Sequence, residues 1–289
     1  MIARLFSRLF SRLFPRLFPH IFSRLFGRRP VAGVPDEAWR AIRSELRFLD
    51  WLQEDEWARL RALVASFLDA KEFTATGGLE LDDRMKLSIA VQGCLPILNL
   101  GLDWYDGWVG IVVYPAEFVI PRSVVDEDGI VHEYDEVASG EAWGDGPLLV
   151  SWQDVEMAGD GYNVVIHEFV HKLDMLNGEA DGRPPLHPGM SPAAWEKALA
   201  TAYADFCARV DAGEDTTIDP YAAESPGEFF AVFAEAFFET PQILHDEYPA
   251  VYAQLAAFFR LDPLAAGRRA GTPAAGASSH AFMHNRPNE

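Results

Sequence analysis

The sequence contains little cysteine and no long hydrophobic run, and each absence excludes a class of protein. Only Cys94 and Cys207 are present among 289 residues, and they form no CxxC motif. Neither a disulfide framework nor a cysteine zinc site is therefore expected, and a reducing cytoplasm is the expected location. No run of about eighteen apolar residues occurs, so we expect no transmembrane helix.

The first 30 residues contain no acidic side chain, although the whole chain has a net charge of −20. They carry seven arginines in a four-residue repeat of the type RLFS, which leaves −27 for the rest of the chain. We therefore expect no direct nucleic-acid binding by the core. The repeat lies close to the helical period and predicts a short basic amphipathic helix, interrupted at Pro15 and Pro19. Two interpretations remain open for residues 1–30: peripheral contact with anionic lipid, and a disordered extension.

Between the two ends of the chain, the composition predicts a single globular domain. Apolar residues make up 49% of the sequence, which is enough for a sizeable core. The C-terminal segment GRRAGTPAAGASSHAFMHNRPNE is small, polar and aperiodic, which is typical of disorder. We predict a basic tail over residues 1–35, a domain over residues 36–262 and a disordered tail over residues 263–289.

The order of the predicted helices and strands indicates an α+β fold. Helical periodicity covers residues 36–71 and continues through residues 82–102. The segments WVGIVVYP, FVIPR and PLLVSW predict strands of a small mixed sheet, because they are apolar and contain or adjoin Gly or Pro. A helix from Val164 and further helices follow. The domain is therefore expected to be mainly helical, with the sheet before the helix at Val164.

The stretch VVIHEFVHKLDMLNG at residues 164–178 combines an amphipathic pattern with two histidines. At about 100° per residue, His167 and His171 lie about 40° apart and one turn along the axis, so both can bind one metal ion. Glu168 projects roughly 60° beyond His171, where a general base beside such an ion would stand. The HExxH pattern therefore predicts a metal site on a helix that Asn177-Gly178 ends. The apolar stripe of this helix consists of Ile166, Phe169, Val170, Leu173 and Leu176.

The residues alone leave the third ligand open. A metzincin would carry glycine at position 174 and histidine at position 177, but Asp174 and Asn177 stand there, so that pattern is excluded. Glu228 stands three residues after Ser225, so it fits either a ligand or the glutamate of a helix-capping box. Glu235 lies among phenylalanines and needs a partner, as a ligand or as an acceptor for one. Further glutamates nearby are Glu224 and Glu239.

Long segments of the chain carry a family resemblance: GGLELDDRMKLSIAVQGCLPILNLGLDWYDGW, VVYPAEFVI, GPLLVSWQDV, HEFVHKLDMLNG and DPYAAESPGEFFAVFAEAFFETP. Across roughly residues 40–262 the sequence resembles the Mlc titration factor A family of bacterial zinc-dependent peptidases. The resemblance implies a zincin-like metallopeptidase domain, with Zn²⁺ bound by His167, His171 and Glu228. It also implies that Glu168 is the base and that Tyr221 stands at the active site. Members of this family bind the glucose repressor Mlc, so a similar transcriptional repressor is implied as a partner.

The implied chemistry is hydrolysis of peptide bonds in a peptide or protein substrate. Two imidazoles and one carboxylate leave a fourth zinc position open for water, whose proton Glu168 takes during attack on the carbonyl. Tyr221 either donates a hydrogen bond to the oxyanion or closes the loop before the next helix. Asp174 is either an acceptor for a histidine N–H or a solvated charge. The strand at residues 147–152 is a candidate edge for binding extended substrate.

A regulatory protein-binding module is the alternative function. In that case zinc would be structural and hydrolysis incidental. The glutamate at position 168 favours the enzyme, because a structural zinc site has no use for a base. His187, in PPLHPGM, is better explained as a loop residue than as a ligand.

Overall fold

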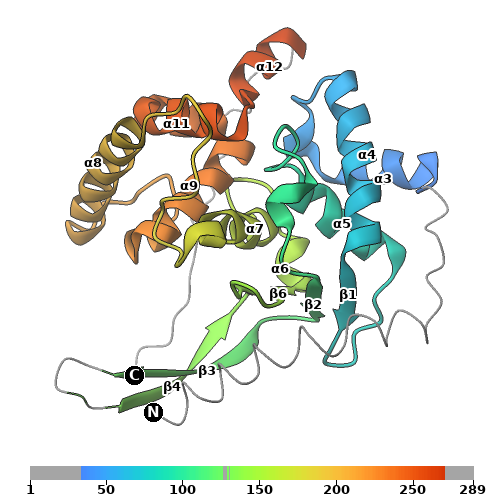
Figure 1. Ribbon diagram of the computed structural model, residues 1–289, viewed down its shortest axis with the longest axis horizontal. Coiled ribbons are helices and arrows are strands. Elements are labelled where there is room, and N and C mark those ends of the chain that lie inside the picture. Colours follow the sequence, from blue (N-terminus) through green and yellow to red (C-terminus); the bar gives the residue numbers. More distant parts are fainter. Residues whose placement is uncertain (1–33, 126–128, 130, 271–289) are drawn as a thin grey trace.

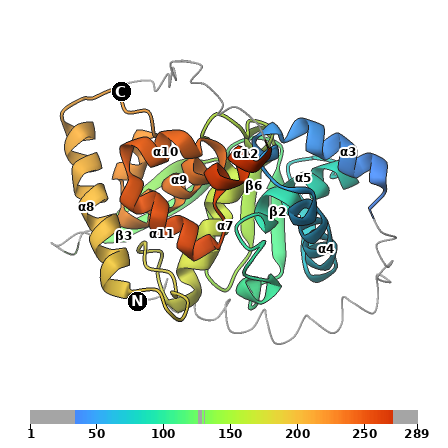
Figure 2. The same cartoon turned by 90° about the horizontal axis from the view of Figure 1, so that it is seen from above.

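The computed structural model describes residues 34–125, 129 and 131–270. Its centre is α7 (Val164–Asp174), which lies above a small sheet (Figure 1). The N-terminal helices and the C-terminal helices lie on opposite sides of α7 (Figure 2). This mainly helical arrangement with a small mixed sheet confirms the predicted α+β class. None of the described helices combines the length and the apolar character that a membrane span requires.

Four short strands form a mixed sheet in the order β1-β2-β6-β5. β1 (Glu72–Ala75), β2 (Gly110–Tyr114) and β6 (Leu148–Ser151) run parallel, and β5 (Gly140–Ala142) pairs antiparallel with β6. Every residue of β6 is buried, as expected for a strand with a neighbour on each side. The strand at residues 147–152 is therefore not the edge that we considered. That edge of the sheet is β5.

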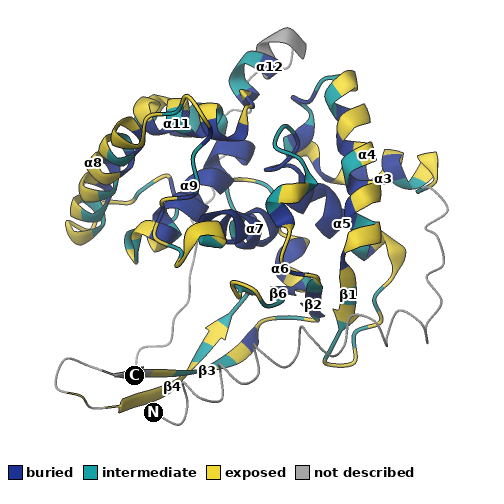
Figure 3. Cartoon of the chain, viewed as in Figure 1, coloured by how far each residue is buried: buried dark blue, intermediate teal, exposed yellow. Residues whose placement is uncertain are grey.

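A two-stranded hairpin extends away from the sheet below α7 (Figure 1). β3 (Phe118–Val125) and β4 (Val131–Ala138) pair antiparallel, with Val119 opposite Val137. Both valines are exposed, as is much of the hairpin (Figure 3). The sequence predicts β3 but not β4, because VHEYDEVA is rich in acidic side chains. It also misses β1 and β5, which have only four and three residues.

The ordered domain continues beyond residue 262, where we expected it to end, because helix α12 follows. Its bounds are Pro263–Ala270, within the segment that we expected to be disordered, and the buried side chain of Ala266 shows that it packs on the domain. The basic repeat of residues 1–30 and residues 271–289 lie outside the described residues. The remaining helices are α3 (Asp36–Glu45), α4 (Glu54–Ala70), α5 (Asp83–Cys94), α6 (Trp152–Val155), α8 (Pro192–Asp211), α9 (Pro226–Glu239), α10 (Pro241–Glu247) and α11 (Pro249–Phe259).

Aromatic side chains fill the core on both sides of α7. In α9, Phe229 stacks on Phe233 with ring centroids 3.8 Å apart. On the other side, Phe169 of α7 packs against Tyr105 with centroids 5.2 Å apart. The Phe169 ring also lies against Gly93 of α5, where a side-chain carbon would come within 2.6 Å of it. A larger residue would force these helices apart, so the glycine sets how closely α5 and α7 pack. Both α7 and α9 are almost entirely buried (Figure 3).

Candidate metal centre

Helix α7 begins at a buried asparagine that joins three helices. Asn163 Oδ1 accepts a hydrogen bond from the backbone N–H of Ile166 over 2.9 Å, which caps the first turn. The Nδ2 group of Asn163 donates to Gln92 of α5 and to Glu239 of α9, in both cases over 2.8 Å. These bonds tie the start of α7 to two neighbouring helices. The histidines in the following turns are therefore carried by a firmly held segment.

The far end of α7 differs slightly from the expectation. The α-helix ends at Asp174, and a 3-10 turn (Met175–Asn177) leads to Gly178. Leu176, expected in the apolar stripe, is 42% exposed, because the tighter turn moves it off the buried face. The other four members of the stripe are buried.

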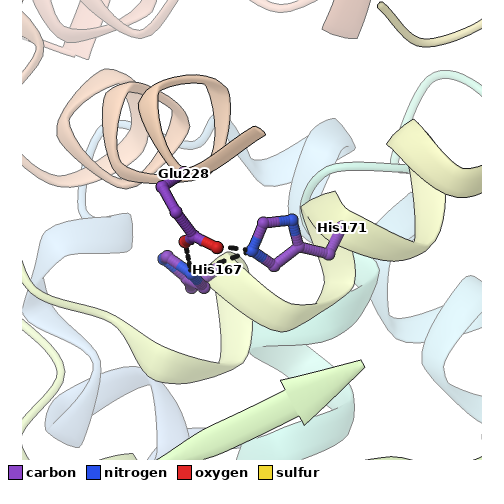
Figure 4. A group of neighbouring side chains, drawn as sticks. All are labelled: His167, His171 and Glu228. Carbon is purple, nitrogen blue, oxygen red and sulfur yellow. Dashed lines mark hydrogen bonds and ion pairs between the residues drawn. The ribbon is translucent and has the colours of Figure 1, made fainter. Parts of the chain in front are cut away.

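Three side chains from α7 and α9 converge on one point (Figure 4). The Nε2 atoms of His167 and His171 are 3.0 Å apart. Glu228 Oε2 lies 2.9 Å from the first of these atoms and 3.3 Å from the second. One ligand atom from each residue falls within 4.8 Å of the others, which is the arrangement of a three-ligand metal site.

The structure separates the two candidate glutamates of α9. The backbone N–H of Glu228 donates to Ser225 Oγ over 3.1 Å, so Ser225 caps α9, while the Glu228 carboxylate contacts the histidines. Glu235 Oε1 instead accepts from Nδ1 of His167 over 2.8 Å, on the opposite side of the ring. Its second oxygen accepts from the backbone N–H of Asn163 over 2.5 Å. Glu235 therefore meets the prediction that it needs a partner, as an acceptor behind His167.

The donor atoms fit a divalent metal ion. In the metal-free chain, burial opposes protonation of His167, but hydrogen bonds to Glu228 and Glu235 raise its pKa well above the usual value, so the ring is protonated. A metal ion would take the place of the proton on Nε2, the atom that faces His171 and Glu228, while Nδ1 still donates to Glu235. Although burial opposes it, hydrogen bonds to His167 and His171 lower the pKa of Glu228 well below its usual range, so the carboxylate is ionised. Two imidazole nitrogens and one carboxylate oxygen are a donor set typical of zinc in hydrolytic enzymes.

Glu168 lies beside this group without belonging to it. The residue is only 5% exposed, and burial raises the pKa of its carboxyl group to about 7. Within the part of the chain that the structure describes, Oε2 of Glu168 has no hydrogen-bond partner. Its other side-chain atoms lie against Gly140 of β5. The carboxyl group is therefore buried between the edge strand and the histidines.

Tyr221 approaches the group from the segment before α9. It lies in the 3-10 turn η4 (Pro220–Ala223), which Asp219 caps by accepting a hydrogen bond from the backbone N–H of Tyr221. The Tyr221 and His167 rings have centroids 6.1 Å apart, and Tyr221 remains 43% exposed. A substrate could therefore reach this phenol beside the histidines. A ring that only closed the loop before α9 would not need such exposure, so the position favours the interpretation as a hydrogen-bond donor.

Asp174 and His187 have other partners. Asp174 is fully buried, so the interpretation as a solvated charge is wrong. Its Oδ2 accepts from the backbone N–H of Gly182 over 2.7 Å, and among the described residues no hydrogen bond joins it to either histidine. His187 lies in a loop, as expected, and its Nε2 donates to the carbonyl of Phe258 over 2.7 Å. The sequence offered no signal for Asn163 or Gly140, and it offered Glu239 only as a further candidate glutamate; the roles of all three depend on contacts across the fold.

Comparison with known proteins gives consistent matches. The model of a family described as glucose-regulated metallo-peptidase M90 matches residues 24–260. Mlc titration factor A of Salmonella arizonae is 39% identical over 231 residues, which cover 74% of this chain and 92% of the relative. The protein of the same name from Escherichia fergusonii is 39% identical over 233 residues, which cover 79% and 88%. That of Salmonella typhimurium is 40% identical over 216 residues, which cover 73% and 82%.

Proposed function

Because the chain belongs to the glucose-regulated metallo-peptidase M90 family, we propose that it hydrolyses peptide bonds with a zinc ion bound by His167, His171 and Glu228. Membership of a metallo-peptidase family implies a metal ion. The convergence of two imidazole nitrogens and one carboxylate oxygen is the observation that carries the assignment of these ligands. Their chemistry supports zinc over magnesium or calcium, which prefer all-oxygen sites.

Glu168 acts as the proton carrier in this proposal. A bound zinc ion would polarise the scissile carbonyl group and make a water molecule acidic enough to react near neutral pH. Glu168, with a pKa of about 7 that results from burial, can take a proton from the attacking water at this pH. The same carboxyl group then returns the proton to the amine that leaves. Its position next to the ligands, but outside them, supports this role.

Tyr221 and Glu235 assist in different ways. The hydroxyl group of Tyr221 would donate a hydrogen bond to the carbonyl oxygen as negative charge develops, a contact worth about 3 kcal/mol in comparable sites. Partial burial, together with the negative charge of Glu228 and other nearby carboxylates, raises the pKa of this hydroxyl group well above its usual range, so it keeps the proton that it donates. Glu235 holds the ring of His167 through Nδ1 and so positions a ligand without touching substrate.

A second candidate function is the binding of a repressor similar to Mlc. The name of the relatives, Mlc titration factor A, favours it. Such a partner would be a protein, consistent with the strong negative charge of the chain outside its first 30 residues. Binding and hydrolysis are separable, because removal of the metal should abolish hydrolysis but leave a surface remote from the site unchanged.

The test measures metal content and peptide hydrolysis on one purified sample. We expect about one zinc ion per chain and cleavage of short peptides, both blocked and unblocked. A chelator should abolish cleavage, and zinc should restore it where magnesium does not. Cleavage that persists in the fully metal-free protein would contradict the proposal. A metal-loaded protein that cleaves no peptide, yet binds a purified repressor of the Mlc type, would favour the second function.

A further inference from the structure

No hydrogen bond from a described residue determines the orientation of Glu168. The residue is almost fully buried, and its Oε2 atom has no hydrogen-bond partner in the described part of the chain. A glutamate side chain has three rotatable bonds, so an unbonded carboxyl group needs packing to hold it in one position. The contacts around Glu168 therefore decide where its proton-carrying oxygens lie.

The edge strand β5 makes the closest of these contacts. A side-chain carbon added at Gly140 would lie 2.5 Å from Glu168 Oε1, 2.6 Å from its Cγ and 2.8 Å from its Cδ. Carbon atoms in proteins essentially never approach so closely, so the side chain of Glu168 occupies the space that any other residue at position 140 would fill. Glycine inside a strand commonly marks such a close approach, and no positive φ angle gives Gly140 another reason to be glycine.

From this contact we propose that Gly140 is a positioning residue, whose missing side chain lets the carboxyl group of Glu168 rest against the edge strand beside the histidines. The kinetic part of this inference rests on the proposed peptidase function, whereas the contact itself does not. A methyl group at position 140 would push the carboxyl group out of its place or force β5 away from α7. Either movement changes the distance between the base and the reacting atoms, to which hydrolysis is sensitive.

The turn after β5 supplies a matched control. Gly144 is an exposed residue in the same hairpin connection, and a side-chain carbon there would meet nothing within 4 Å. Its φ angle is not positive, so alanine is not strained at this position. Gly140→Ala and Gly144→Ala are therefore the same chemical change, four residues apart, with and without Glu168 in the way.

Unfolding of the metal-free protein tests the contact without any assay of activity. Gly140→Ala should lower the melting temperature by about 2 °C or more in the wild-type background. Glu168→Ala removes all three atoms that the added methyl group would meet, so Gly140→Ala should have little effect in that background. Gly144→Ala should behave alike in both backgrounds. Equal losses from Gly140→Ala in both would show that the strand itself needs the glycine and would overturn the inference.

Kinetics of the zinc-loaded protein test the consequence. Gly140→Ala should lower kcat by about tenfold to a hundredfold, with KM changed far less and zinc content equal to wild type. Gly144→Ala should leave all three quantities near their wild-type values. A folded Gly140→Ala protein with wild-type kcat would contradict the positioning role. If the wild-type chain itself cleaves no peptide, the proposed function fails, and the coupling in unfolding still decides whether Gly140 and Glu168 share this contact.

Discussion

Helix α7 separates two buried charge environments that are built in different ways. On the side of α9, the carboxylates of Glu228 and Glu235 bond to the two nitrogens of His167. On the side of the sheet, Nζ of Lys71 and Nζ of Lys172 approach the ring of Trp108, 3.6 and 4.7 Å from its centroid. The hydrogen bonds of these lysines go to backbone carbonyl oxygens. The acids thus hydrogen-bond to ionisable partners, whereas the hydrogen bonds of the two lysines to described residues go to backbone dipoles.

The pKa values reflect this difference. Hydrogen bonds to the histidines lower the pKa of Glu228 below its usual range, even though burial opposes them. For the lysines burial prevails, so it lowers the pKa of Lys71 to about 8 and that of Lys172 to about 7. A carboxylate that stays ionised can hold a cation. Lysines that partly lose their charge serve instead as donors that fix backbone turns, such as the turn of residues 143–146.

The largest effect is expected at Glu168, which lies against the sheet side of α7. Glu168→Gln keeps the size of the side chain and removes only its ability to carry a proton. We expect kcat to fall at least about a hundredfold, with zinc content and melting temperature close to wild type. Measurement of zinc and of peptide cleavage on the same sample checks this. A mutant with full zinc and undiminished cleavage would assign the activity to another site or to a contaminant.

The next effect distinguishes the two carboxylates on the α9 side. Glu228→Gln should weaken zinc binding by more than about a hundredfold, because it removes a ligand charge, while α9 keeps its Ser225 cap. Glu235→Gln should weaken it by about tenfold to a hundredfold, since it alters only the partner of His167. Zinc titration against a competing chelator gives both values, and circular dichroism checks the helix content. A greater loss for Glu235→Gln would move the third ligand to that residue.

A smaller effect concerns the connection between the two sides at Asn163. Asn163→Ala should lower the free energy of unfolding of the metal-free protein by about 2–3 kcal/mol, because it removes a helix cap, leaves Gln92 Oε1 without this donor and takes one of several donors from Glu239. Ser225→Ala removes a less buried cap from α9 and should cost about 1 kcal/mol. Urea unfolding measures both. Equal losses would mean that the contacts of Asn163 with α5 and α9 add nothing.

The smallest effect is the pH dependence of stability that the buried Lys71 causes on the sheet side of α7. Lys71 has a folded pKa of about 8, below its usual value of 10.5, so between these values only the unfolded chain binds the proton. The free energy of unfolding should therefore rise with pH in this window, by about 1.5 kcal/mol between pH 8 and 9.5. Lys71→Met lacks this contribution. Two charged neighbours of Lys71 remain in both proteins: Lys172, whose charge Lys71 repels, and Asp106, which attracts Lys71. Urea unfolding from pH 7.5 to 9.5 measures the effect. If the difference in free energy of unfolding between wild type and Lys71→Met stayed constant over this range, the prediction would be wrong.

The part of the site that follows from helical geometry could be predicted from the sequence. Two histidines one turn apart must lie on one face of α7, and the pattern of apolar residues places that face at the edge of the core. The choice between Glu228 and Glu235 could not be made in this way, because both lie on α9 and both needed a partner. It depends on how α9 packs against α7, which local spacing in the sequence does not determine.

The fold was predictable where the chain has a strong local pattern. The longer helices and the strands β2, β3 and β6 have clear apolar patterns, whereas β4 is acidic, β5 is only three residues long, and the short helices α6, α10 and α12 were not predicted. Because β5 was missed, its position at the edge of the sheet and the contact of Gly140 with Glu168 were missed too. Asp174 was misjudged for a similar reason, since only the loop that brings Gly182 to it makes it a buried acceptor.

The bonds of Asn163 should also slow any separation of the histidines. A local opening of α7 at its first turn must break bonds to α5 and α9 as well as the helix cap, so it should require nearly the full free energy of unfolding. The backbone amide protons of Ile166 and His167 should accordingly be among the slowest to exchange with deuterated water, whereas those of the exposed β3–β4 hairpin exchange quickly. The histidines would then keep their spacing through many cycles of substrate binding and release.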